Sequence, residues 1–408
     1  MKRHSLDQIE KVLERFVHWL QQYGETSWDH QTYFASSIGR RAKALYYRNK
    51  ALGTMAVAPM ILSEALAPSA RRLFSERVRF PIADAHYAMG FALQARAQDD
   101  PRFHAHAIRF LAELEKSRCP GYQTFCWGYP FDWETRNGTI CRGTPLITST
   151  PYVYEAFREV YELDRDPRWR TVMRSMVRHV TEDIRDYTFS NSASTCSYTP
   201  FDKGGVVNAS AYRAAMLTCA SVDFNEPRYW EIAQRNLNFV LETQRTDGSW
   251  PYSVDGERDF VDHFHTCFVL KALAKVDRLM PGDATRDAIN RGVDYYLSNL
   301  LDEKSLPKPF SKAPRMTVYR RELYDYAECI NLCVLLGDRI VAMDDVLGCV
   351  IQDLLDRWVK SDGSFRSREL WLTWDNVPMH RWAQSQMFRS LSLLVLKQRE
   401  SLTANQVA

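Results

Sequence analysis

A repeat of helical segments, with a period of about sixty residues, limits the folds open to this chain more than any other feature of its sequence. Segments that are rich in small and apolar residues, with polar residues at their N-terminal ends, recur along the whole chain. They begin near Ile82, Pro145, Asn208, His263, Tyr326 and Trp382, at intervals of 55 to 63 residues. A repeat of this length indicates a supersecondary unit that buries its apolar face only against its neighbours.

Longer and more charged helices alternate with these apolar segments. Examples are "PRFHAHAIRFLAELEKS" from Pro101 and "PRYWEIAQRNLNFVLETQ" from Pro227, in which apolar residues follow the helical period and charges occupy the other face. Six apolar helices that alternate with six amphipathic ones predict an inner ring surrounded by an outer ring. The sequence therefore predicts an all-α fold, an (α/α)6 toroid whose closure leaves no exposed ends.

The domain organisation follows from the same repeat. Residues 1–408 are predicted to form one toroid domain, with a helical insertion around residues 36–79 that does not fit the alternation. The connectors from outer to inner helices are long and rich in turn residues, and we expect short β-hairpins in them. In the connector that starts "QRTDGSW" at Gln244, the segments "WPYSV" and "RDFV" are expected to pair after an Asp-Gly turn. These connectors and the N-terminal ends of the inner helices meet at one rim, where free N–H groups favour a functional cavity.

Charge and composition exclude several classes of function. The 53 basic and 50 acidic residues nearly balance, which argues against a nucleic-acid-binding surface. No apolar run is long enough for a membrane span, and the basic N-terminus leads into an amphipathic helix rather than a secretion signal. The nine cysteines are scattered without a Cys-x-x-Cys pair, which favours free thiols and a cytoplasmic protein. Metal-ligand spacings and nucleotide, flavin or pyridoxal signatures are absent from the sequence, so we expect neither a metal nor a cofactor.

Two resemblances concern the fold and the biological setting. "QRTDGSW" resembles the repeat of terpene cyclases and related α/α toroids, where it is chiefly a joint after an outer helix; the acid and metal motifs of those cyclases are absent here. Over nearly the whole chain, the sequence resembles the VpsJ-like bacterial proteins of polysaccharide biosynthesis. The segments that carry this resemblance are "WGYPFDWETR", "TPLITSTPYV", "SYTPFDKGGVVNASAY", "DGSWPYSVDGERDFVDHFHTCF" and "MHRWAQSQMF". It implies a six-hairpin toroid that acts in the production of surface polysaccharide.

A more distant similarity is to N-acylglucosamine 2-epimerases, which carry two catalytic histidines on the fourth and sixth inner helices. Here His265 lies in the predicted fourth inner helix and His380 just before the sixth. Both are candidate acid/base residues. Asp262 is expected to cap the fourth inner helix, and a carboxylate that orients His265 would let it act as a general base near neutral pH. The structural alternative is a simple cap and hydrogen-bonded histidines in the wall.

Glu328, near the start of the fifth inner helix, is the fourth catalytic candidate, because burial would raise the pKa of its carboxyl and suit it to act as an acid. Asp325 lies one turn earlier in the same helix. The alternative for both carboxylates is an ion pair with Arg320 or Arg321.

A larger set of residues is expected to contact a substrate at the rim. Aromatic side chains offer flat apolar faces to sugar rings, and charged or amide groups offer hydrogen bonds. The candidates are Trp127, Tyr129, Asp132, Trp133, Arg142, Tyr198, Asn208, Trp250, Tyr252, His263, Asp325, Trp371 and Arg381. Their alternative role is structural, as staples of rigid loops or in closure of the ring.

These observations predict a carbohydrate-active protein that processes a polysaccharide or a lipid-linked glycan by general acid/base chemistry, as a glycoside hydrolase or a lyase would. A sugar epimerase with a histidine pair is the alternative reaction. A non-catalytic saccharide-binding scaffold of the polysaccharide-assembly machinery is the alternative from another class. Two ionisable side chains beside one sugar ring would distinguish a catalyst from a binder.

Overall fold

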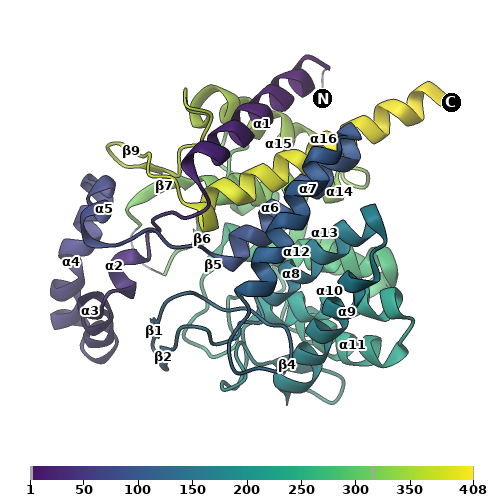
Figure 1. Ribbon diagram of the computed structural model, residues 1–408. Helices are drawn as coiled ribbons and strands as arrows, with labels where there is room; N and C mark the ends of the chain where they lie inside the picture. Colours follow the sequence, from purple (N-terminus) through teal and green to yellow (C-terminus); the bar gives the residue numbers. More distant parts are fainter. Residues whose placement is uncertain (1–2, 315–316, 408) are drawn as a thin grey trace.

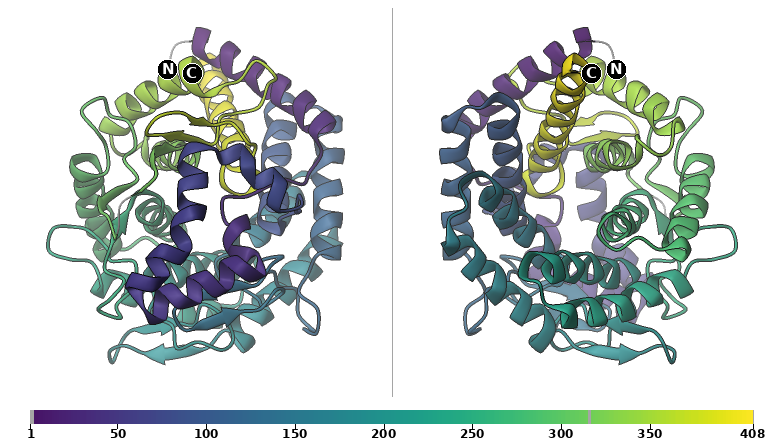
Figure 2. Two further views of the ribbon diagram at one scale, coloured as in Figure 1. Left: turned by 90° about the vertical axis from the view of Figure 1, so that its left-hand side faces the viewer. Right: turned by 90° about the vertical axis from the view of Figure 1, so that its right-hand side faces the viewer.

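The computed structural model describes residues 3–314 and 317–407, and it confirms the (α/α)6 toroid (Figures 1 and 2). The inner ring consists of α6 (Pro81–Gln98), α8 (Thr150–Asp164), α10 (Val207–Phe224), α12 (His263–Leu279), α14 (Leu323–Leu336) and α16 (Ser385–Val407). Consecutive inner helices contact each other and α16 contacts α6, so the ring is closed. Small residues make this closure possible: a Cβ added at Gly90 of α6 would lie 2.5 Å from the Phe388 ring of α16.

The outer ring consists of α1 (Arg3–Tyr23), α7 (Pro101–Lys116), α9 (Pro167–Arg178), α11 (Pro227–Glu242), α13 (Asp283–Asn299) and α15 (Ala342–Asp353). These helices are amphipathic, as the sequence predicts. In α7, for example, Ala107, Phe110, Leu111 and Leu114 are buried while the charged residues stay outside. The outer helices thus cover the inner ring with their apolar faces.

At one rim the chain turns from inner to outer helix within a few residues. Three of these turns share a left-handed residue, since Asp99, Arg165 and Asn225 have φ angles of 52°, 55° and 54°. Asp100 and Asp166 then cap α7 and α9 by accepting from the backbone N–H two residues on, at 2.9 and 2.8 Å. A proline follows at the first helical position, where no N–H is needed.

The opposite rim carries the long connectors, which contain the predicted short strands. These are β1 (Trp133–Thr135), β2 (Gly138–Ile140), β3 (Asp186–Thr188), β4 (Ser194–Cys196), β5 (Val261–Asp262), β6 (Phe310–Lys312), β7 (Tyr319–Glu322), β8 (Arg368–Leu370) and β9 (Trp374–Asp375). β1–β2, β3–β4 and β8–β9 pair within a connector, whereas β5–β6 and β7–β8 join neighbouring connectors. The hairpin expected after Trp250 is therefore only partial: the Tyr252 N–H donates to the Phe260 carbonyl at 3.0 Å, but β5 pairs with β6 instead.

The "QRTDGSW" stretch is a structural joint. The side chain of Gln244 donates to carbonyl oxygens of Gly248 and of α13, at 3.0 and 2.9 Å, and the Trp250 indole donates to a carbonyl of α11 at 2.9 Å. Gly248 has φ of +88°, and a Cβ there would lie 2.2 Å from the Arg291 carbonyl oxygen. The second Asp-Gly-Ser turn is similar, because a Cβ at Gly363 would lie 2.6 Å from a carbonyl oxygen of α1. Close packing of turn against helix explains both glycines.

The segment expected to be an insertion is helical and lies outside both rings. It contains α3 (Ser37–Arg48), α4 (Lys50–Leu66), η1 (Pro68–Ala70) and α5 (Arg71–Phe74), and α2 (Thr32–Ala35) precedes it. Figure 2 shows α3 and α4 crossing the middle of the ring at the rim with the long connectors. We call residues 32–74 the cap. Within the described residues, no single helix is long and apolar enough to cross a membrane. The segments Lys50–Leu66 and Pro68–Phe74, which meet at a bend of 113°, have the required length and composition only when they are taken together.

The predicted helix starts differ from the observed ones in three places. α8 begins at Thr150 rather than at Pro145, because the preceding backbone bonds to other connectors; the Ile147 N–H donates to the Tyr198 carbonyl at 3.0 Å. α14 begins at Leu323 rather than near Tyr326. The last inner helix is entered through a π-helical turn, η4 (His380–Gln384).

Candidate functional site

Asp262 and His265 form a closely bonded side-chain pair at the connector rim. Asp262 ends β5 and caps α12 as predicted, because its Oδ1 accepts from the His265 N–H at 3.0 Å. Its Oδ2 lies 2.6 Å from Nδ1 of the His265 ring. Asp262 is 3% exposed, whereas the His265 side chain is 22% exposed. A carboxylate on Nδ1 selects the tautomer whose Nε2 carries a lone pair, so His265 is arranged as a base.

A small pocket opens beside this pair. The predicted site residues that line it are Asn208, Trp250, Tyr252, Asp262 and His265. The Tyr252 ring lies edge-on to His265, with centroids 4.7 Å apart. The buried Oδ1 of Asn208 has no hydrogen-bond partner among the described residues, so an acceptor faces this region unsatisfied. The structure thus brings five sequence-predicted residues to one small hollow.

A second acid/base group lies at the start of the next inner helix. Glu322, which precedes α14, is buried, and burial together with the neighbouring charge of Asp325 raises the pKa of its carboxyl to about 8. Burial also raises the pKa of Asp325, although His263 opposes this through a contact of 3.3 Å between Nδ1 and Oδ1. Glu322 therefore carries a proton at neutral pH. A protonated carboxyl and an oriented histidine on adjacent inner-helix starts can serve as acid and base.

The alternative partners expected for the carboxylates of α14 are wrong. Asp325 pairs with a histidine of α12, and Glu328 forms a buried ion pair with Lys271. Arg321 instead contacts Asp302 of its own connector and Glu369 of the next connector, and Arg320 forms no ion pair within residues 3–314 and 317–407.

One aromatic or imidazole ring from the first two turns of each of the inner helices α6 to α14, and one from η4 before α16, contribute to a layer, which we call the aromatic layer. Its members, in ring order, are His86, Tyr152, Tyr212, Phe268, Tyr324 and Trp382. Consecutive centroids lie 4.6, 5.2, 5.2, 5.9 and 5.0 Å apart. Such rings offer the flat faces on which a sugar can stack.

Deeper along the inner helices lies a cluster of charged residues, of which Lys271, Glu328 and Arg389 are buried and Glu155 and Lys275 are half-buried. Lys271 pairs with Glu328, and Glu155 pairs with both Lys275 and Arg389, the latter at 3.1 Å. A second pocket opens beside these residues, between α8, α10 and α12. Because Glu328 is fully buried in this cluster, its position favours a structural or electrostatic role over direct contact with a substrate at the rim.

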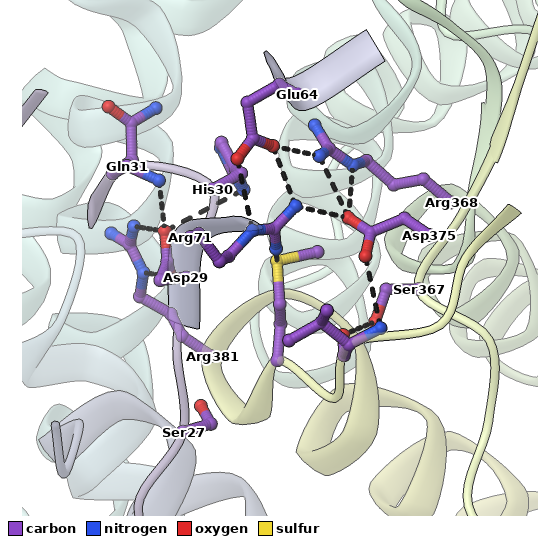
Figure 3. A network of polar contacts seen from close by, with 12 residues as sticks. Ser27, Asp29, His30, Gln31, Glu64, Arg71, Ser367, Arg368, Asp375 and Arg381 are labelled. Atoms are coloured by element: carbon purple, nitrogen blue, oxygen red, sulfur yellow. Dashed lines mark hydrogen bonds and ion pairs between the residues drawn. The ribbon is translucent and has the colours of Figure 1, made fainter. Parts of the chain in front are cut away.

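The cap is attached to the rim through a buried ionic network (Figure 3). Arg71 of α5 donates to Glu64 of α4 at 3.0 and 2.7 Å and to Asp375 of β9 at 2.6 Å. Arg368 of β8 contacts both carboxylates, at 2.9 Å for Asp375. Burial would raise the pKa of Asp375, but the two guanidinium groups outweigh it and lower that pKa. Two positive and two negative groups therefore balance between the cap and the last connector.

Two further contacts hold the cap and the chain leading into it. Arg381 donates to both oxygens of Asp29 at 2.8 and 2.9 Å, and although burial opposes it, Arg381 lowers the pKa of Asp29 to about 2. Arg40 of α3 pairs with Asp132 at 3.0 Å. Arg381 also lies 4.7 Å over the Tyr129 ring. Two predicted substrate-binding residues, Asp132 and Arg381, are thus engaged in closing the cap over the rim.

His380 is placed in the closure of the ring. Its Nδ1 lies 2.5 Å from the Tyr87 hydroxyl and its Nε2 lies 3.0 Å from the Gly24 carbonyl oxygen. The side chain is fully buried, and burial lowers its pKa to about 3. With both nitrogens bonded and the ring neutral, the geometry favours a structural role, and His265 is left without the histidine partner that the sequence indicates.

The remaining predicted residues do not share one location. Three of them lie together at the rim: the ring centroid of Trp133 is 5.5 Å from that of Tyr129 and 6.3 Å from that of Tyr198. Trp127 and Trp371 lie elsewhere: the first is fully buried and donates to the Leu114 carbonyl, and the second is 63% exposed on the turn between β8 and β9. Arg142 is exposed, and its backbone N–H donates to Asp132, the carboxylate that also pairs with Arg40 of α3.

Sequence reasoning missed several residues of this region. Glu322 could have been found from the spacing of "ELYDYAE", which places three carboxylates at intervals of three residues. His30 lies 5.1 Å from Trp382, between ring centroids, but "SWDHQTY" carries no periodic signal. Arg71 has a nearby partner in Glu64, but its partner on β9, Asp375, is 304 residues away in the chain, so no local pattern indicates that contact.

Within residues 3–314 and 317–407, no group of three or more His, Cys, Asp and Glu side chains is arranged to hold a metal ion. His265, Glu322 and the aromatic layer all lie at the connector rim.

No family model and no curated protein matches the sequence. Solved structures do resemble the fold. A cellobiose 2-epimerase from Bacillus thermoamylovorans B4167 has a TM-score of 0.62 at 6% identity, over 78% of this chain and 88% of that one. A GH76 α-mannanase from Bacteroides thetaiotaomicron has a TM-score of 0.60 at 8% identity, over 81% and 89%. A family 88 glycosyl hydrolase from Bacteroides vulgatus has a TM-score of 0.56 at 10% identity, over 83% and 97%. At these identities the likeness establishes the six-hairpin toroid and nothing finer.

Proposed function

We propose that this protein is an enzyme that cleaves a saccharide chain by general acid/base chemistry beneath the cap. The observations that carry the proposal are the Asp262–His265 pair at the start of α12 and, at the start of the next inner helix, the carboxyl of Glu322, whose pKa is raised to about 8. Glycosidic cleavage requires one group that accepts a proton and one that donates a proton. Without such an acid and base, the aromatic and polar side chains at the rim would suit a saccharide-binding protein equally well.

Each residue has a definite role in the proposed reaction. His265 Nε2 removes a proton, Asp262 stabilises the resulting imidazolium, and Glu322 donates its proton to the glycosidic oxygen that leaves. In a hydrolase the proton taken by His265 comes from water, whose oxygen forms the new bond to the anomeric carbon. In a lyase it comes from the carbon next to a carboxylate, and the electron pair of that C–H bond forms the new double bond.

The surroundings support a saccharide as the substrate. The aromatic layer and Tyr252 provide faces for stacking, and the unsatisfied amide oxygen of Asn208 can accept from a hydroxyl. The fold is shared with proteins named as an epimerase, a mannanase and a glycosyl hydrolase, which act on saccharides.

The resemblance to VpsJ-like proteins supports a polysaccharide or a lipid-linked glycan of surface or exopolysaccharide biosynthesis as the physiological substrate, with the assembly machinery as partner. We propose a cytoplasmic location, which the nine free cysteines support. We also retain the interpretation of residues 1–408 as one domain.

A sugar epimerase is the second candidate reaction, favoured by the fold shared with the cellobiose 2-epimerase. An epimerase needs two acid/base groups that exchange a proton at one carbon. Because His380 has both nitrogens bonded, the partner of His265 would be Glu322 in this chain. A scaffold that only binds saccharide is the candidate from another class.

The test uses His265→Ala and Glu322→Gln, with His104→Ala as the matched control. His104 is also an Asp-paired histidine, at 3.1 Å from Asp164, with a side-chain exposure of 29%, but it lies at the rim with the short turns. Each variant is scored for saccharide binding by calorimetry and for turnover of a panel of bacterial polysaccharides. New reducing ends indicate a hydrolase, ultraviolet absorbance of unsaturated uronate a lyase, and a new sugar epimer by proton NMR an epimerase.

We expect both site variants to bind saccharide within a few-fold of the parent and to lose turnover by about 10²-fold or more, whereas His104→Ala keeps it. Loss of binding and turnover together in the site variants would favour the scaffold. Unchanged turnover in both site variants would refute the assigned roles.

A further inference from the structure

The outer face of the cap is apolar where a surface helix is normally polar. On α4, the residues at intervals of three and four that face outward are Leu52, Met55, Pro59, Leu62 and Leu66. The leucines and the methionine are 50 to 65% exposed. The opposite face carries the buried Gly53, Val57 and Glu64. A helix with this distribution exposes its apolar stripe and turns its one carboxylate inward, the reverse of an ordinary surface helix.

The neighbouring helices extend this face. Leu73 and Phe74, at the end of α5, are 82% and 68% exposed, and Ile38 of α3 is 73% exposed. Of the eighteen large apolar side chains that are exposed in the described part of the chain, ten lie between residues 38 and 74. Figure 1 shows α3, α4 and α5 at one extreme of the molecule, away from both rings. Apolar surface concentrated in this way marks an interaction site rather than ordinary scatter.

The cap is also strongly basic. Residues 32–74 contain seven Lys or Arg and one Asp or Glu, a net charge of +6 in a chain of net charge +3. On α3 the outward positions alternate between apolar and basic residues, as Ile38, Arg41, Leu45 and Arg48. Lys50 at the start of α4 is also exposed.

We propose that this outer face of the cap, formed by α3, α4 and α5, docks onto the surface of a membrane that contains anionic phospholipids. Apolar side chains between basic ones are the pattern by which a helix lies in the interface, with its leucines among the acyl chains and its arginines at the phosphates. The inference is independent of the reaction proposed for the rim.

Two features favour a membrane surface over other occupants. A second copy of the chain would bring one strongly positive face against another, which disfavours self-association through the cap. A complete span would require α4 and α5 to leave the rim, although Glu64 and Arg71 tie them to Asp375 and Arg368 in a buried network. The helices therefore lie on the bilayer, and the rim beneath the cap faces it.

The test is co-sedimentation of the full chain with vesicles of phosphatidylcholine alone, or of phosphatidylcholine mixed with phosphatidylglycerol, at low and high salt. We expect binding to the anionic vesicles only, and weaker binding at high salt. Leu62→Ser and Leu73→Ser test the apolar part, with Val341→Ser as control, because Val341 is 81% exposed in the turn between α14 and α15. Each leucine variant should weaken the partition about ten-fold.

The charge is tested with the double variant Arg41→Ser/Arg48→Ser. Its control is Arg102→Ser/Arg228→Ser, which removes two exposed arginines from the opposite rim, with side-chain exposures of 84% and 70%. Removal of one basic residue near an anionic surface weakens partition about five-fold, so the cap variant should lose roughly 25-fold and the control little. Circular dichroism confirms that each variant is folded.

Three outcomes would overturn the proposal. The parent chain fails to bind anionic vesicles at low salt; the cap variants bind as well as the parent, so that another surface is responsible; or sedimentation velocity shows a dimer that Leu62→Ser abolishes, so that the occupant is a second copy.

Discussion

Replacement of Arg71 by alanine should release the cap from the rim while leaving the toroid folded. Arg71 is fully buried and donates to Glu64 and Asp375, and without it the cation that still contacts both carboxylates is Arg368. Loss of one partner of a buried ion pair costs about 3–5 kcal/mol. Because Arg368 still contacts both carboxylates, we expect the lower end, about 3 kcal/mol. Since about 1.4 kcal/mol corresponds to a factor of ten, the cap should open roughly 150-fold more often.

The assay is limited trypsin digestion under native conditions. Arg41 and Arg48 lie in α3 and become cleavable when the cap opens, so the cleavage rate follows the population of the open state when closing is faster than cleavage. Mass spectrometry of the fragments separates cuts within the cap from cuts in the rings.

Arg72→Ala is the matched control for this prediction. It removes the same charge and the same number of trypsin sites at the next position, but Arg72 is exposed and its recorded contact is with the Trp28 ring at 5.3 Å. We expect its cleavage rate within a few-fold of the parent. If Arg71→Ala is cleaved no faster than Arg72→Ala, the ionic network does not hold the cap and the reasoning fails.

Three further expectations concern stability. Gly248→Ala and Gly256→Ala both place a side chain at positive φ, +88° and +77°, but only at Gly248 would the new Cβ meet a carbonyl oxygen, that of Arg291 at 2.2 Å. Thermal denaturation should show Gly248→Ala less stable than Gly256→Ala by about 1–3 kcal/mol, and equal losses would contradict the packing described for this joint. The folded-state pKa of Glu322, about 8, exceeds the ordinary 4.5, so this group's contribution is fully present at low pH and is lost as pH rises through about 8. In urea denaturation, the free energy of unfolding of the parent should fall by up to about 1.4 kcal/mol per pH unit between pH 4.5 and about 8, and Glu322→Gln should lack this fall. Parallel curves for parent and variant would refute the assignment. His380→Ala should lower the free energy of unfolding by about 2–4 kcal/mol, because it leaves a buried tyrosine hydroxyl and a carbonyl unpaired; an unchanged value, measured by denaturant titration, would argue against its structural role.

The candidate site shows both the reach and the limits of sequence reasoning. The Asp262 cap and its contact with His265 were predictable, because a residue at the N-cap and one three positions later must meet at the first turn of a helix. His380 was indicated by its place before the sixth inner helix. Its packing against Tyr87 and Gly24, which are 293 and 356 residues away, decides that both its nitrogens are bonded.

Local periodicity by itself determined the architecture of this protein. Alternating apolar and amphipathic segments of constant length have few ways to bury their apolar faces, so the toroid, its two rims and the place of the insertion follow from hydrophobic burial along the chain. Only the tertiary structure decided what the insertion does, since its position over the mouth depends on Glu64 and Arg71 meeting Asp375 and Arg368 at the far end of the sequence. The same holds for Glu322, because the elevated pKa of its carboxyl arises from burial and from nearby charges, which a linear pattern of residues does not specify.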